Sequence, residues 1–143
     1  MIRRREVPTL TGILETSLYV ARLDTAVDFY LSLFELEVLA RDERMCALAV
    51  HEGQVLLLFE KGASSDAIET GGGFIPAHDG TGDLHIAFAI PAAELSPWED
   101  RLGNLGIEIE SRVVWSRGGT SIYFRDPDGH LVELATPGLW RNY

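Results

Sequence analysis

Residues 123–138, YFRDPDGHLVELATPG, decide how the second half of the chain folds. The central DPDG, at 126–129, has the composition of a tight turn, because Asp and Gly tolerate the backbone angles that turns need. The flanking residues predict strands near 119–125 and 130–135. Glu133 falls inside the second of these strands, where an unpaired charge is costly, so it needs a partner.

The same pattern occurs earlier in the chain. GQVLLLFEKG at 53–62 aligns with GHLVELATPG at 129–138, and LETSLYVA at 14–21 aligns with LHIAFAIP at 84–91. The period of this repeat is too long for a solenoid protein. We therefore expect two copies of one module that pair edge to edge.

Each copy has the same predicted order of elements: strand, helix, strand, strand, strand. Asp24 or Thr25 is expected to cap the first helix with its side chain. The predicted elements cover 13–20, 24–34, 36–42, 45–50 and 54–60 in the first copy, and 84–90, 94–106, 107–115, 119–125 and 130–135 in the second.

The chain of 143 residues fits one structural domain. Its expected parts are an N-terminal extension (1–12), the first module (13–60), an inter-module loop (61–82), the second module (83–138) and a C-terminal tail (139–143). The loop is Gly-rich and polar, and it is long enough to act as a lid or a linker that carries His78. His51 is expected in a turn and His130 on the surface.

Composition excludes several classes of protein. With 46% hydrophobic and 24% charged residues and no apolar run that could cross a bilayer, a soluble globular protein is expected. The formal charge of −10 disfavours nucleic acids and anionic membranes as partners. The N-terminal MIRRREVPTL lacks the features of a secretory signal and Cys46 is the single cysteine, so a cytoplasmic location is expected.

Because side chains alternate along a strand, the sheet of each module has one apolar face and an opposite face that carries polar and ionisable side chains. Glu15 and His85 occupy equivalent positions in the two copies, and Glu133 has the matching orientation in the last strand. Ser17 and Tyr19 share the face of Glu15, so Tyr19 is expected to line the same site. The residues expected to pack on the helices are Leu14, Leu18 and Val20 in one copy and Leu84, Ile86, Phe88 and Ile90 in the other.

One histidine and two carboxylates on a concave sheet face would form an N,O,O site for one divalent cation such as Mn²⁺, Fe²⁺, Ni²⁺, Co²⁺ or Zn²⁺. Three protein ligands would leave positions for water or substrate oxygens, as a catalytic metal requires. In the alternative interpretation, Glu15 and Glu133 bond to Arg or Tyr neighbours and His85 is a satisfied core histidine. The agreement between the repeat and the strand faces favours the metal site.

Residues 13–138 resemble the vicinal oxygen chelate superfamily, which includes glyoxalase I, extradiol dioxygenases, and fosfomycin and bleomycin resistance proteins. The resemblance rests on SLYVARLDTAVDFYLSLFELEVL, on GDLHIAFAI and above all on YFRDPDGHLVELATP. It implies an α+β fold in which two βαβββ modules form a curved, cup-shaped mixed sheet with the helices outside. It also implies metal ligands at Glu15, His85 and Glu133, with Leu57 at the fourth position.

The resemblance assigns further roles. Fosfomycin thiol transferases have a hydroxyl residue at the position of Ser17 and the Ser and Tyr that stand here as Ser121 and Tyr123. Ser17, Tyr19 and Ser121 are thus candidates for substrate binding, and Tyr123 for catalysis. Most members with three ligands have His where Glu15 stands, so Glu15 is expected to be a ligand or a general base. Independently of the resemblance, Arg125 has the same strand parity as Ser121 and Tyr123, which makes it a candidate anion clamp for a carboxylate or phosphonate. The alternative is a salt bridge to Asp126 or Asp128 across the turn.

The activity implied by the resemblance is metal-dependent. The enzyme would chelate a small substrate with vicinal oxygens and stabilise an oxyanion, as a lyase, isomerase, thiol transferase or dioxygenase. The alternative is a metal-free protein that binds a small molecule or sequesters an antibiotic, as in bleomycin resistance. Members of this chain length commonly exchange modules, so a homodimer with shared sites is expected.

Overall fold

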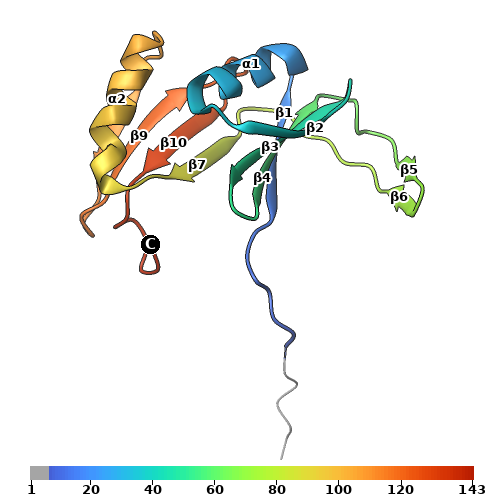
Figure 1. Cartoon of the computed structure of the whole chain (residues 1–143), viewed down its shortest axis with the longest axis horizontal. Coiled ribbons are helices and arrows are strands. Elements are labelled where there is room, and N and C mark those ends of the chain that lie inside the picture. Colours follow the sequence, from blue (N-terminus) through green and yellow to red (C-terminus); the bar gives the residue numbers. More distant parts are fainter. Residues whose placement is uncertain (1–6) are drawn as a thin grey trace, which may run out of the picture.

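The computed structural model describes residues 7–143, in which two modules lie beside each other (Figure 1). The first module contains β1 (Glu15–Val20), α1 (Leu23–Phe34), β2 (Glu37–Arg41), β3 (Met45–His51) and β4 (Gln54–Glu60). A connecting hairpin follows, β5 (Ile68–Thr70) and β6 (Gly73–Ile75). The second module contains β7 (His85–Ala89), a short 3₁₀ helix (Ala92–Glu94), α2 (Leu95–Asn104), β8 (Ser111–Val114), β9 (Thr120–Arg125) and β10 (Leu131–Ala135).

Each module forms a mixed four-stranded sheet with the same topology. The strand orders are β1-β4-β3-β2 and β7-β10-β9-β8, and the first pair in each order is parallel. Ser17 lies opposite Leu57 in one sheet, and Ala87 lies opposite Glu133 in the other. These pairs are the ones that the sequence repeat places at equivalent positions, so the predicted duplication and the α+β fold class are confirmed.

Helix α1 forms because its apolar side chains recur at helical spacing. Its buried residues are Leu23, Ala26, Val27, Tyr30 and Leu33. The predicted cap at Asp24 or Thr25 is wrong, since the N-cap residue is Arg22 and no side chain caps the helix. Asp24 instead accepts a hydrogen bond from Arg41 at 2.6 Å, and its charge lies in the first helical turn, where the helix dipole favours an anion.

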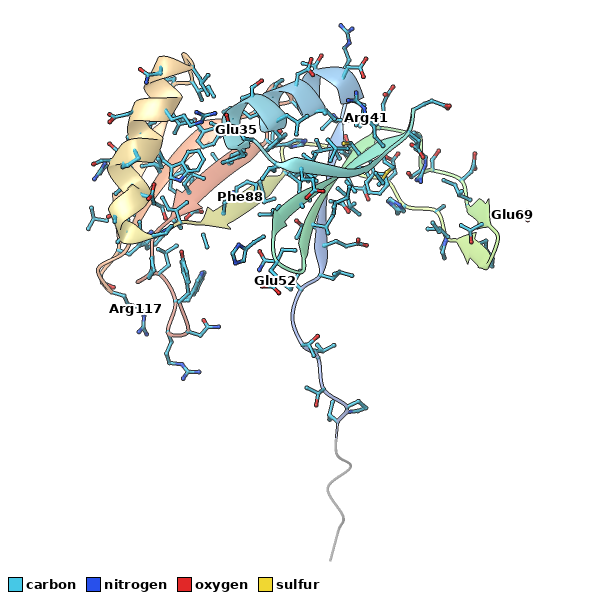
Figure 2. All side chains as sticks on the ribbon, viewed as in Figure 1. Glu35, Arg41, Glu52, Glu69, Phe88 and Arg117 are labelled. Atoms are coloured by element: carbon cyan, nitrogen blue, oxygen red, sulfur yellow. The ribbon has the colours of Figure 1, made fainter. Side chains whose placement is uncertain are left out.

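The two modules share one hydrophobic core. Phe34 at the end of α1 contacts Phe88 of β7 and Trp98 of α2, with ring centroids 4.7 and 5.4 Å away. Figure 2 labels Phe88, whose strand lies below α1 and beside the lower end of α2 in this view. Arg101 of α2 donates hydrogen bonds to the carbonyl groups of Ser32 and Leu33 at the C-terminal end of α1. Apolar contacts and hydrogen bonds therefore join the modules inside one chain.

The DPDGH turn forms a second, polar connection between the modules. His130 is 0% exposed, so its predicted surface position is wrong. Its Nδ1 accepts a hydrogen bond from the Leu84 amide, and its Nε2 lies 2.7 Å from the Tyr19 carbonyl, to which it donates. Tyr30 of α1 donates to Asp126 at 2.8 Å. A histidine with one donor and one acceptor nitrogen thus connects β1 to the second module.

Some expectations at the edges of the fold are corrected. Leu14 was expected in the packed face but is 63% exposed, because β1 begins only at Glu15. The segment 61–82 is not a plain loop, because it contains the β5–β6 hairpin, which projects from the body of the protein (Figure 1). Among residues 7–143, no helix is long and apolar enough to cross a membrane.

Candidate metal and substrate site

His85 and Glu133 lie together on the second sheet. His85 is the first residue of β7 and Glu133 is the middle residue of β10, which pairs directly with β7. The distance from His85 Nε2 to Glu133 Oε1 is 3.2 Å. The Glu133 side chain is only 6% exposed, whereas that of His85 is 50% exposed, so the pair has one buried and one accessible member.

The other ring nitrogen of His85 decides what lies between the pair. His85 Nδ1 is 2.9 Å from the carbonyl oxygen of Leu131, which can only accept a hydrogen bond, so Nδ1 carries the hydrogen. In a neutral imidazole, Nε2 is then a lone-pair acceptor that faces a carboxylate oxygen. Two acceptors at this distance need a cation between them, either a proton on Nε2 or a metal ion. Metal-ligating histidines are oriented by this kind of bond from the second nitrogen to a carbonyl group.

Ser121 of β9 holds the second oxygen of Glu133. Its hydroxyl donates to Glu133 Oε2 at 2.5 Å and accepts from the indole Nε1 of Trp115 at 2.8 Å. Both the donor and one acceptor position of Ser121 are therefore used inside the protein. Ser121, which the sequence predicts to bind substrate, is thus also placed to orient Glu133.

Tyr123 lies next to this pair. It is opposite Glu133 in the β9–β10 ladder, and its ring centroid is 6.4 Å from that of His85. Burial, and next the charge of Glu133, raise the pKa of the Tyr123 phenol. The residue therefore presents a neutral O–H group near the candidate ligands at physiological pH, as a hydrogen-bond donor to a substrate oxygen would.

The first module holds the remaining predicted residues around a separate cavity of about 460 Å³. Glu15, Ser17 and Tyr19 line it, together with Arg44, Met45, Leu57, Phe59, Ile75 and His78. Among residues 7–143 of one chain, no group of three His, Cys, Asp or Glu side chains is close enough to hold a metal ion. The chain thus brings together His85 and Glu133 but does not add Glu15 to them.

His78 reaches this cavity from the inter-module segment. Its backbone amide donates to the Ser64 carbonyl at 2.9 Å, and its Nδ1 is 2.6 Å from the Tyr19 hydroxyl. Gly80 lies so close to the Tyr19 ring that a β-carbon would overlap it. In the sequence, the glycine of PAHDG near His78 indicates a turn in a polar loop. The contact of His78 with Tyr19 links residues far apart in the chain, so no local pattern predicts it.

Arg125 is the last residue of β9, two residues after Tyr123. Its guanidinium pairs with Glu110 at 2.8 Å and also donates to the Gly129 carbonyl. The hydrogen bond with Glu110 raises the pKa of Arg125. The partner differs from the aspartates considered for a salt bridge, and the arginine's charge is compensated on the surface.

Comparisons with known proteins agree with this architecture. The family model described as Glyoxalase/Bleomycin resistance protein/Dioxygenase superfamily matches residues 12–134. The metallothiol transferase FosB of Bacillus licheniformis is 30% identical over 132 residues, which cover 92% of this chain and 79% of that protein.

Solved structures of related proteins have the same fold. The crystal structure of a lactoylglutathione lyase from Agrobacterium tumefaciens is 34% identical, with a TM-score of 0.85, and the match covers 94% of this chain and 99% of that one. FosX from Listeria monocytogenes, in complex with Mn(II) and sulfate, has the same fold, with a TM-score of 0.65, 24% identity, and coverage of 90% of this chain and 91% of that one. The chain therefore belongs to the glyoxalase/bleomycin resistance protein/dioxygenase superfamily.

Proposed function

We propose that this protein is a divalent-metal-dependent enzyme that holds a small substrate through two neighbouring oxygen atoms. His85, Glu133 and Glu15 would be the protein ligands of one cation. The observation that supports the proposal is the approach of His85 Nε2 to Glu133 Oε1 at 3.2 Å, with His85 Nδ1 bonded to the Leu131 carbonyl. When bound, the cation would supply Lewis-acid stabilisation of negative charge that develops on a substrate oxygen.

The donor set fits such a cation. One imidazole nitrogen and carboxylate oxygens suit Mn²⁺, Fe²⁺, Co²⁺, Ni²⁺ or Zn²⁺, and Mn(II) is present in the structure of the related FosX from Listeria monocytogenes. Each of the two close ligands already has an orienting bond, from His85 to the Leu131 carbonyl and from Ser121 to Glu133. Such bonds reduce the reorganisation that metal binding requires.

Residues around the pair would orient the substrate and move its protons. Tyr123, kept neutral by burial, would donate a hydrogen bond to a substrate oxygen. Glu15 is exposed at the start of β1 and would act as the third ligand or, when not bound, as a general base. Ser17 and Tyr19 line the cavity beside Glu15 and would contact the substrate.

We further propose that the site is completed in a homodimer, where Glu15 of one protomer joins His85 and Glu133 of its partner. Several large apolar side chains are exposed in the single chain, which supports burial against a second copy. They include Ile13, Leu14, Phe74, Val114 and Trp140. Ile13 and Leu14 adjoin Glu15, so an interface that covers them would also enclose this carboxylate.

Metal content tests the proposal. Purified protein, stripped with chelator and reloaded with Mn²⁺, should retain one ion per chain after dialysis, as measured by plasma mass spectrometry. Glu133→Gln should weaken the affinity by about tenfold or more, because a neutral amide replaces an anionic ligand. Glu110→Gln removes an equal charge from the surface and serves as the matched control, which should bind like the original chain.

Failure to retain any of the five candidate ions after reloading would contradict the proposal. The cup would then be assigned to metal-free binding of a small molecule, the alternative function within this superfamily. A Glu110→Gln variant that loses as much affinity as Glu133→Gln would show that the ions bind through general negative charge, which would equally exclude the assigned site.

A further inference from the structure

One wall of the first-module cavity is cationic, and the proposed metal ligands do not use it. Arg44 lies in the tight turn between β2 and β3 and lines the cavity together with Glu15. The Asp42 carboxylate accepts hydrogen bonds from the backbone amides of Arg44 and Met45, at 2.8 and 3.0 Å. The turn that carries the arginine is therefore held in one conformation.

The guanidinium of Arg44 is oriented by two neutral neighbours. Its Nη1 donates to the Ser64 hydroxyl at 2.8 Å, and its central carbon lies 5.6 Å from the centroid of the Phe59 ring. Ser64 is 2% exposed, so one end of this contact is buried. These contacts fix the direction of the side chain but leave its positive charge uncompensated.

The described arginines without a carboxylate partner are Arg22, Arg44, Arg117 and Arg141, and Arg44 is the one of these four that lines this cavity. The described arginines that pair with a carboxylate are Arg41, Arg101, Arg112 and Arg125. Arg44 forms no such pair within residues 7–143, although the chain has 22 acidic and only 12 basic residues. An ordered arginine that lines a cavity and forms no ion pair with the carboxylate there, Glu15, is suited to bind an anion from solution.

Tyr19 and His78 add a hydrogen-bond donor on the same cavity. Their bond, between the Tyr19 hydroxyl and His78 Nδ1, uses one hydrogen. A neutral histidine and a neutral tyrosine have two such hydrogens, so one N–H or O–H remains for another acceptor in either tautomer. Burial, and next the charge of Asp79, raise the pKa of Tyr19 and keep the phenol protonated.

We propose that Arg44, with the Tyr19–His78 pair, recognises an anionic group of the substrate, such as a carboxylate or phosphonate. Met45, Leu57 and Phe59 line the same cavity and would contact an apolar part of that molecule. The inference rests on the proposed function, because Glu15, which lines this cavity, is assigned there as a metal ligand or base. It narrows the substrate to a small organic anion that also carries two neighbouring oxygens.

The competing explanation is structural: Arg44 could serve only to hold the inter-module segment through Ser64. Phenylphosphonate, an anion with an apolar ring, separates the two roles. Isothermal titration of the full chain, loaded with Mn²⁺ and separately after treatment with chelator, should detect binding of phenylphosphonate in both states. Arg44→Gln should weaken this binding by about tenfold or more, the usual effect of losing a charge-assisted hydrogen bond.

Two variants serve as matched controls. Arg41→Gln removes an equal charge three residues earlier, from a residue that pairs with Asp24 beside the start of α1 (Figure 2), and it should bind phenylphosphonate like the original chain. Ser64→Ala removes the contact that holds Arg44 but keeps the cation, so its loss of affinity should be smaller than that of Arg44→Gln. If Arg44→Gln does not fold, Arg44→Lys replaces it and should also bind more weakly, because it lacks the planar fork.

Three results would overturn the assignment of Arg44: no binding of phenylphosphonate by the original chain, equal affinity of Arg44→Gln, or an equal loss in Ser64→Ala. Metal content, measured on the same samples, reports separately on the proposed function. A chain that retains no metal but binds phenylphosphonate through Arg44 would reject the metal site and support the anion site.

Discussion

Glu133 has two oxygens with different surroundings. Oε2 accepts a hydrogen bond from Ser121, whereas Oε1 faces Nε2 of His85. The sequence predicts that this carboxylate needs a partner, because it interrupts a buried strand. It also predicts His85 on the matching strand face. The role of Ser121 could not be predicted this way, because a hydroxyl beside a site can contact either the ligand or a substrate.

The orienting role of Ser121 can be tested directly. Ser121→Ala leaves Glu133 Oε2 and the Trp115 indole without their shared hydroxyl, so the carboxylate can rotate. We expect about tenfold weaker Mn²⁺ affinity, in the range found for other residues that orient metal ligands. Competition with a fluorescent chelator measures this change. Thr120→Ala, one residue earlier on the opposite face of β9, is the control. Unchanged affinity in Ser121→Ala would contradict the role.

At the scale of elements, α1 is the one that joins the modules most directly. Tyr30 donates to Asp126 in the DPDGH turn, and Phe34 packs on Phe88 of β7. The helix was predictable from its apolar spacing, as were the strands from their alternation. The contacts of its side chains with the second module were not, because they link residues far apart in sequence and follow no local period.

The Tyr30 contact predicts a dependence of stability on alkaline pH. Burial, and next the Asp126 charge, raise the pKa of Tyr30 well above the usual value of about 10 for tyrosine. Above about pH 10, Tyr30 loses its proton in the unfolded chain but keeps it in the folded chain. The free energy of unfolding should therefore fall as the pH rises. Tyr30→Phe should be less stable at pH 7 by about 1–2 kcal/mol and should show a weaker fall above about pH 10.

Urea unfolding at several pH values between neutrality and about pH 11 provides the measurement. Tyr143→Phe is the control, because that tyrosine is part-buried near the C-terminus and has no aspartate partner among residues 7–143. The free energy of unfolding of Tyr143→Phe should still fall at alkaline pH almost as much as that of the original chain. Parallel curves for Tyr30→Phe and the original chain would show that the phenol of Tyr30 does not cause the dependence.

The inter-module segment shows where sequence patterns lose their predictive value. The β5–β6 hairpin is short and exposed, so it lacks the alternation of buried strands. His78 was expected in a lid or linker, and its contact with Tyr19 follows no local sequence pattern. His130 was expected at the surface because it follows a turn, but it is buried since its two nitrogens satisfy backbone groups of both modules.

At the scale of the whole molecule, the predicted site residues of one chain fall into two separate groups. His85, Ser121, Tyr123 and Glu133 form one group, while Glu15 lies by the cavity of the first module. The duplication was predictable because it repeats a pattern along the sequence. Whether the two modules that form one site come from the same chain or from two chains was not predictable, because both arrangements have the same sequence pattern.

Mixed dimers test the shared site. If Glu15 comes from the partner, a heterodimer of Glu15→Gln and Glu133→Gln chains contains one site with both changes and one intact site. Coexpression with two different tags should therefore give a dimer of twice the 15.8 kDa chain mass that regains high-affinity Mn²⁺ binding at half the sites. Each variant expressed alone should lack such binding.

A site built within one chain predicts the opposite result, because every site of the heterodimer would then carry one change. Light scattering of the purified mixture checks the mass at the same time. A particle of single-chain mass, or a heterodimer without any recovered binding, would reject the shared arrangement.

The common core of the two modules has an evolutionary consequence. Phe34 and Leu33 on one side and Phe88 and Leu102 on the other belong to a single apolar cluster, so each half buries part of its apolar surface on the other. An ancestor with a single βαβββ unit would have needed to meet another molecule of itself, and its folding would have depended on its abundance in the cell. Fusion of two gene copies replaced that encounter with a tethered one at a constant effective concentration. Each half could then diverge, and the positions of Leu57 and Glu133 could acquire different chemistry.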